Sequence, residues 1–167
     1  TGPGAYHHTE PVVHGLWPQV RPFGDSRCIR PKDDGFPGFV ASCYAQGGAA
    51  GKQLSFERHE WENHGKCAGV ADAKDFFGQV CGLSSEPLRV MAGARAADLD
   101  VASTADQLQR SGICVWALGS NQQIELLACA GTDGRWKLAD ARDFPEVCGS
   151  GGAASPPPQQ QQQQQQQ

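Results

Sequence analysis

Apolar residues recur at a helical spacing in the middle of the chain, which predicts a first helix. The segment "DAKDFFGQVCGL" begins at Asp72, whose carboxylate is a suitable N-cap for the free backbone N–H groups of a first turn. A second start signal is "TADQ" at 104–107, which has the spacing of a capping box and predicts a short helix ending near Gly112. The apolar positions of the first segment share one helical face: Phe76, Phe77, Val80 and Leu83.

The last third of the chain changes to short apolar runs that are typical of strands. "CVWAL" at 114–118 and "QIELLAC" at 123–129 are separated by "GSNQ", which is a hairpin signal. "TDGR" at 132–135 marks another turn before "WKLAD" at 136–140. Helices followed by strands predict an α+β fold, in which an antiparallel central sheet is flanked by helices.

The remaining segments carry little periodic pattern. We expect "PVV" at 11–13 to be the stub of a strand, and residues 18–53, rich in Gly, Pro and charge, to be loop with a short helix. Residues 149–167, "GSGGAASPPPQQQQQQQQQ", lack large apolar groups and are predicted to be a disordered tail. The folded domain is therefore expected to span residues 1–148, long enough for a real hydrophobic core.

Composition narrows the class of protein. No apolar run is long enough to cross a bilayer, and there is no segment typical of a signal peptide. Seven cysteines in so small a chain favour an oxidising compartment and a fold stabilised by disulfides, and their odd number leaves one without a partner in the chain. The net charge of −4 at neutral pH would reverse in acid if the five histidines were protonated, which would suit an anionic ligand.

The segment "HEWENHGKC" at 59–67 gathers many reactive side chains into nine positions. If this segment is helical, Glu60 and His64 share a face at i and i+4, and His59 lies on an adjoining flank. A carboxylate beside an imidazole favours the charged ring and suits proton transfer. A zinc-peptidase helix is an alternative, but its histidines are four residues apart and these are five apart, so no metal site is predicted. The plainest alternative is a helix whose polar groups are merely solvated.

A second segment, "HGLWPQ" at 14–19, favours the catalytic interpretation. It offers another histidine, His14, followed by a glycine that permits close backbone approach. Trp17 is either a core residue or a plate on which a nucleic-acid base could stack.

Together the two segments resemble the signature boxes "HGLWP" and "HEWxKHGTC" of the ribonuclease T2 family of acid endoribonucleases. The resemblance covers most of residues 13–148 and implies an enzyme that cuts single-stranded RNA through a 2′,3′-cyclic phosphate. It implies that His64 is the general base and His14 the general acid, with Glu60 and His59 at the phosphate. It also implies that Trp17 and Gln19 contact a base of the RNA. The implied reaction needs no cofactor, and DNA, which lacks the 2′-hydroxyl, should not be cut.

The resemblance also implies disulfides. Cys28 is expected to pair with Cys67, and Cys114 with Cys148 as a C-terminal bridge. It gives no partners for three further cysteines: Cys43, Cys81 and Cys129.

Three departures from the family pattern concern catalysis and stability. Asn63 stands where the family has a lysine that stabilises charge on phosphorus, and the loss of such a bond costs about 1.5–3 kcal/mol. Lys66 replaces the usual threonine, and we hypothesise that its ammonium covers part of that deficit. The family's strand before the first box is largely missing, which would leave a sheet edge open.

Two functions follow as hypotheses. The first is a metal-independent endoribonuclease acting at acid pH, a monomer with no membrane association, that is secreted or in a vacuole or lysosome. The second is a weakened or inactive relative that binds RNA, stores protein or signals. Retention of His14, Glu60 and His64 favours the enzyme.

Overall fold

The computed structural model describes residues 10–19, 28–45, 50–119 and 122–149. In chain order it contains α1 (Ala50–Asn63), the 3-10 turn η1 (Gly65–Cys67), α2 (Ala73–Ala96), α3 (Val101–Arg110), β1 (Val115–Leu118), β2 (Ile124–Leu126), β3 (Ala128–Ala130), β4 (Trp136–Leu138), η2 (Ala141–Asp143) and α4 (Phe144–Cys148). The fold is therefore α+β, as predicted. The predicted tail lies outside the described residues apart from Gly149.

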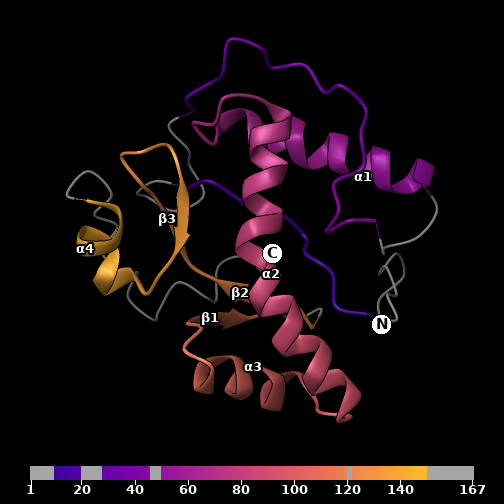
Figure 1. Cartoon of the computed structure of the whole chain (residues 1–167), viewed down its shortest axis with the longest axis vertical. Coiled ribbons are helices and arrows are strands. Elements are labelled where there is room, and N and C mark those ends of the chain that lie inside the picture. The colour runs from indigo at the N-terminus through magenta and orange to yellow at the C-terminus, as the bar shows by residue number, and fades with distance from the viewer. Residues whose placement is uncertain (1–9, 20–27, 46–49, 120–121, 150–167) are drawn as a thin grey trace, which may run out of the picture.

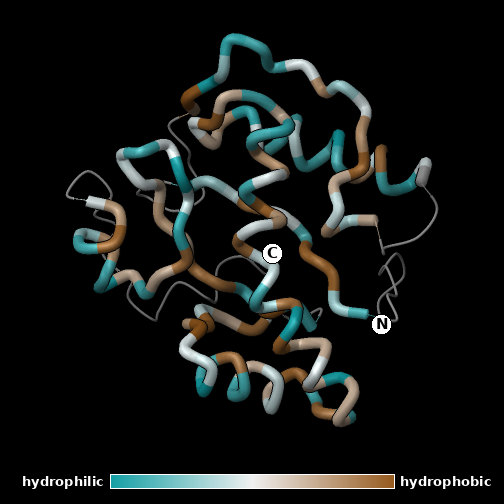
Figure 2. Tube along the Cα trace, viewed as in Figure 1, coloured by the Kyte–Doolittle hydropathy of each residue, from teal (hydrophilic) through white to brown (hydrophobic). Residues whose placement is uncertain are grey.

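The long helix α2 runs through the middle of the molecule, with α1 near one end and α3 near the other (Figure 1). Its start is local chemistry, because the Asp72 carboxylate accepts a hydrogen bond from the Asp75 N–H at 2.8 Å. Phe76, Phe77 and Val80 are buried, as the apolar spacing predicted. Along α2 and α3, hydrophobic stretches alternate with hydrophilic ones (Figure 2).

The start of α3 differs from the prediction. Asp100, not Thr104, caps the helix, and its carboxylate accepts from the Ser103 N–H at 2.7 Å. Thr104 lies one turn inside the helix, where it is buried and its hydroxyl donates to the Asp100 carbonyl. With the cap at Asp100, four residues before the predicted one, α3 buries both Thr104 and Leu108.

The strands form two small antiparallel sheets. β1 pairs with β2, which confirms the hairpin predicted across "GSNQ". β3 pairs with β4 across the turn predicted at "TDGR". The apolar run 123–129 is thus divided between two sheets, and each sheet has two strands among the described residues. Residues 11–13, predicted to be the stub of a strand, are not a strand in this structure. Elsewhere, Ile29 forms a single parallel bridge with Ala68.

The main core lies where α1, η1 and α2 meet residues 10–19 and 28–45. Trp61, Phe76 and Phe77 are fully buried, and the phenol of Tyr44 packs against the same cluster. Gly65 is required there, because a Cβ atom at this position would overlap the ring of Trp61. This packing fixes the end of α1, which carries the "HEWENHGKC" segment.

Three disulfides join described cysteines: Cys28–Cys67, Cys43–Cys81 and Cys129–Cys148. The first confirms the expected pair, and the second gives partners to two cysteines that had none assigned. In a chain-entropy treatment, each disulfide stabilises the folded state by about 3–4 kcal/mol, because it closes a loop of this length in the unfolded chain.

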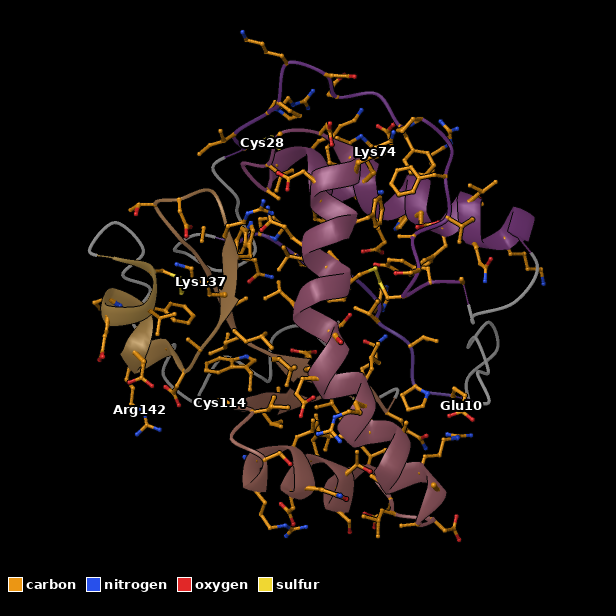
Figure 3. The ribbon with its side chains drawn as sticks, viewed as in Figure 1. Glu10, Cys28, Lys74, Cys114, Lys137 and Arg142 are labelled. Carbon is orange, nitrogen blue, oxygen red and sulfur yellow. A yellow bond between two sulfur atoms is a disulfide. The ribbon has the colours of Figure 1, made fainter. Side chains whose placement is uncertain are left out.

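The expected Cys114–Cys148 bridge is wrong. Cys148 ends α4, which packs on β3, so it meets Cys129 on that strand instead. Cys114 precedes β1 and is an exposed free thiol (Figure 3).

No helix in the described ranges is both long and apolar enough to span a membrane.

Candidate active site

The first sequence box lies against the second, and Glu60 is the point of contact. The side chain of Glu60 is 1% exposed although it carries a carboxylate. One of its oxygens, Oε2, accepts a hydrogen bond from Trp17 Nε1 at 3.0 Å. The other, Oε1, lies 3.4 Å from Nε2 of His14, whose own side chain is 42% exposed. The structure thus brings together three residues predicted to act at one site.

Gly15 makes this close approach possible. A Cβ atom at position 15 would overlap the Glu60 carboxylate and crowd Trp17 Nε1. Any other residue would push the segment carrying His14 and Trp17 away from α1. The glycine of "HGLWP" is therefore explained by contact with a residue of the other box.

Trp17 contacts both predicted catalytic imidazoles. Its ring centroid lies 4.9 Å from that of His14, in an edge-on arrangement, and 5.4 Å from that of His64. The two imidazole centroids are therefore no farther apart than the sum of these distances. Trp17 remains 39% exposed, so part of the indole is open to a ligand. Gln19, predicted to act beside it, is also exposed.

Backbone and side-chain contacts from distant segments hold His14. The Tyr44 hydroxyl donates to the His14 carbonyl at 2.9 Å. The Gln123 amide nitrogen lies 2.7 Å from His14 Nδ1, across 109 residues of sequence. The ring of Phe56 lies 5.3 Å from the imidazole, centroid to centroid. These three contacts were not predicted from the sequence, because no local motif marks them.

Burial sets the protonation of two of these side chains. His64 has its pKa lowered, mainly because burial penalises the charged ring; the Glu60 carboxylate opposes this shift, while His59 and His14 add to it. Burial also raises the pKa of Tyr44, with contributions from the charges of Glu60 and Glu57, so the phenol stays a hydrogen-bond donor. The sequence led us to expect imidazoles held protonated by Glu60; for His64, desolvation outweighs that attraction.

Glu57 is a second buried carboxylate of α1, close to the site. It is fully buried one turn before Glu60 and accepts a hydrogen bond from the Ala41 N–H at 2.7 Å. Burial raises the pKa of Glu57, and the Ala41 hydrogen bond lowers it by less. This contact anchors the segment that carries Tyr44. Two buried oxygens, Glu57 Oε2 and Glu60 Oε1, accept no hydrogen bond from the described residues.

His59 and Asn63 lie on the outer flank of α1. The Asn63 amide donates to the His59 carbonyl at 2.8 Å, and the same nitrogen lies 3.1 Å from His59 Nδ1. Both residues are exposed. Asn63 is therefore engaged with its own helix.

The Lys66 ammonium lies close to two carboxylates. It is paired with Glu62 on α1 and lies 4.0 Å from a carboxylate oxygen of Asp34. This pairing reduces the charge that Lys66 can offer to a phosphate.

No group of three or more histidine, cysteine or acidic side chains is placed to hold a metal ion in the described part of the chain.

Comparison with known proteins gives one link to function. The chain is 33% identical over 94 residues to a curated protein from Aeromonas hydrophila named Ribonuclease. The match covers 52% of this chain and 38% of that protein, so this chain spans well under half of the relative's length. No protein-family model matches the chain, and no solved structure matches it.

Proposed function

We propose that this protein is an endoribonuclease of the ribonuclease T2 type, which cleaves single-stranded RNA without a metal ion. The observation that carries the proposal is the contact of His14 and His64 with one indole, with the buried Glu60 carboxylate reaching His14. Two imidazoles near one another can serve as the acid and the base of a single proton-transfer reaction. The similarity to a protein named Ribonuclease supports the same class of substrate.

In the proposed reaction the substrate supplies its own nucleophile. His64 removes the proton of the ribose 2′-hydroxyl, and the 2′ oxygen forms a bond to phosphorus. The bond from phosphorus to the 5′ oxygen breaks, and His14 gives that oxygen a proton. The products are a 2′,3′-cyclic phosphate and a free 5′-hydroxyl, and no redox step or metal-bound water is needed.

The pKa of His64 fits its proposed role. A general base must be neutral before it acts, and the lowered pKa of His64 keeps it neutral into mildly acid solution. A general acid must carry a proton that it can give up, and the buried Glu60 carboxylate lies 3.4 Å from His14 Nε2. Acid–base catalysis requires the two rings to differ in protonation at one pH, and the contacts of the two rings in this structure differ.

Charge at the phosphate is the weak point of the proposed enzyme. In this structure Asn63 is bonded to His59, and Lys66 is paired with Glu62 and Asp34. His59 is then the remaining partner for the phosphate on the outer flank of α1. We therefore propose a slow enzyme, by about ten- to hundredfold for one lost charge-assisted bond.

The same observation favours a second candidate function, a relative that binds RNA without cutting it. Trp17 would then act as a stacking surface, with Gln19 beside it, and His14 and His64 would be remnants of catalysis. The two candidates predict the same ligand but different products.

We propose an oxidising location for the protein, secreted or in a vacuole or lysosome. Three disulfides are typical of secreted proteins, since such bonds are rare where thiols are kept reduced. We also propose that it acts as a monomer and leaves DNA intact.

The test is incubation with a single-stranded RNA oligonucleotide between pH 4 and 7 in the presence of a chelator. Cyclic-phosphate ends, identified by mass spectrometry, would support the enzyme. A matched oligonucleotide with one 2′-deoxynucleotide should remain intact at that position only. RNA that is bound but uncut would support the second candidate, and RNA that is neither bound nor cut would contradict both.

A further inference from the structure

The hairpin of β1 and β2 reaches the site through one side chain, Gln123. Its amide nitrogen lies 2.7 Å from His14 Nδ1. The backbone of Gln123 is itself fixed, because its carbonyl accepts from the Gly119 N–H at 2.8 Å and closes the hairpin. The side chain therefore projects toward His14 from an anchored position just before β2.

The two nitrogens of His14 have different surroundings. Nδ1 is within hydrogen-bond distance of the Gln123 amide nitrogen. Nε2 lies 3.4 Å from Glu60 Oε1, which is longer than a good hydrogen bond. Nε2 thus has no hydrogen bond of good length among the described residues. A neutral imidazole carries its proton on one nitrogen, and the partner of the other nitrogen decides which.

A glutamine amide can serve both protonation states of the ring. Its NH2 group donates to an unprotonated Nδ1, and after a half-turn its oxygen accepts from a protonated Nδ1. Nδ1 is then satisfied at each stage, and the proton that is exchanged with the substrate belongs to Nε2.

We propose that Gln123 is a positioning residue, which holds the His14 ring so that Nε2 faces the scissile phosphate. The inference rests on the proposed function, since it gives His14 the role of general acid. The β1–β2 hairpin, far from both sequence boxes along the chain, thereby becomes part of the site.

Other groups around His14 can also affect its titration. Glu60 on α1 faces Nε2, and His64 lies near enough to interact electrostatically. The Tyr44 hydroxyl binds the His14 carbonyl rather than the ring, and the rings of Trp17 and Phe56 are uncharged. A change made at position 123 leaves all of these groups in place.

The decisive variant is Gln123→Glu, which keeps the length of the side chain and replaces the amide by a carboxylate. A carboxylate accepts from Nδ1–H and stabilises the imidazolium, so the pKa of His14 should rise by about one unit. NMR titration of His14 with ¹⁵N-labelled histidine measures this shift and shows the proton on Nδ1. The alkaline limb of the rate profile should move upward by the same amount.

A second variant, Gln123→Leu, removes the contact while keeping a side chain of similar size. We expect kcat to fall about tenfold with little change in KM, because RNA still binds but the acid is poorly aligned. Gln109→Leu on the exposed face of α3 is the matched control and should retain full activity.

Two outcomes would overturn the inference: an unchanged His14 titration in Gln123→Glu, or an unchanged kcat in Gln123→Leu. The NMR measurement needs no substrate, so it reports on the contact even if the protein cuts no RNA. Intact RNA with the unaltered protein would instead contradict the proposed function.

Discussion

His59 and Glu60 are neighbours on α1, yet the structure gives them opposite surroundings. Glu60 points inward, where its carboxylate is buried and contacts Trp17 and His14 from a segment more than 40 residues away. His59 points outward, is exposed, and is bonded to Asn63 of the same helix. The inner face depends on distant parts of the chain, whereas the outer flank depends only on α1. Changes on the inner face are therefore expected to cost more activity than changes on the outer flank.

The largest expected effect is loss of a proposed catalytic imidazole. His14→Ala or His64→Ala should lower kcat by about 10²–10⁴-fold, the usual contribution of a general acid or base. His59→Ala on the outer flank should lower it by only about tenfold. Steady-state kinetics on an RNA dinucleotide measures all three. Equal losses would show that the two faces of α1 do not differ as the contacts imply.

The next effect comes from the close approach at Gly15. Gly15→Ala forces its new methyl group into the Glu60 carboxylate, so we expect a loss of about 1–3 kcal/mol in the free energy of unfolding and a fall in kcat. Gly51→Ala, where a Cβ meets open space on α1, is the matched control. It should be neutral or stabilising by up to about 1 kcal/mol. Denaturant unfolding of both variants gives the difference, and similar stabilities would argue against the packing at Gly15.

A gain of activity is expected on the outer flank. Asn63→Lys removes the amide that binds His59 and supplies a cation at the proposed phosphate site. We expect kcat to rise about tenfold, corresponding to one charge-assisted hydrogen bond. Asn63→Leu separates the two causes, because it frees His59 without adding charge. A gain with leucine as well as lysine would assign the effect to His59.

The pH profile reports on the inner face. Because the pKa of His64 is lowered from 6.5, the neutral base persists at lower pH, and the acid limb of kcat/KM should lie below pH 6.5. Glu60→Gln removes a charge that raises this pKa, so the limb should move farther down. An acid limb at or above pH 6.5 in the unaltered protein would contradict the burial of His64.

The smallest effect is expected at Lys66. Its ammonium is held by Glu62 and Asp34, so Lys66→Ala should change kcat by less than about twofold. A large fall would instead support the role hypothesised from the sequence, in which Lys66 replaces the charge lost at Asn63.

Local signals predicted the fold only where short-range chemistry decides it. The Asp72 cap, the apolar face of α2 and the hairpin turn all depend on residues within a few positions of each other. The predicted α3 cap was wrong because both Asp100 and Thr104 can cap a helix. The helix begins after Asp100, and Thr104 is buried inside it. The Cys114 bridge was wrong because disulfide pairing depends on which elements pack together, here α4 on β3.

The candidate site shows the same division. His14, Trp17, Glu60 and His64 stand in two short motifs, and the structure brings these four together. The anchors of His14 could not be predicted in this way. Tyr44 and Gln123 are 30 and 109 residues from His14, and nothing in the sequence around either marks it as a partner of that side chain.

The Cys43–Cys81 bridge ties the residue next to Tyr44 to the long helix α2. The Tyr44 hydroxyl in turn donates a hydrogen bond to the His14 carbonyl, so the bridge supports the backbone of His14 indirectly. We therefore expect thiol-containing buffer to lower the proposed activity, because reduction of this bridge removes a support of His14.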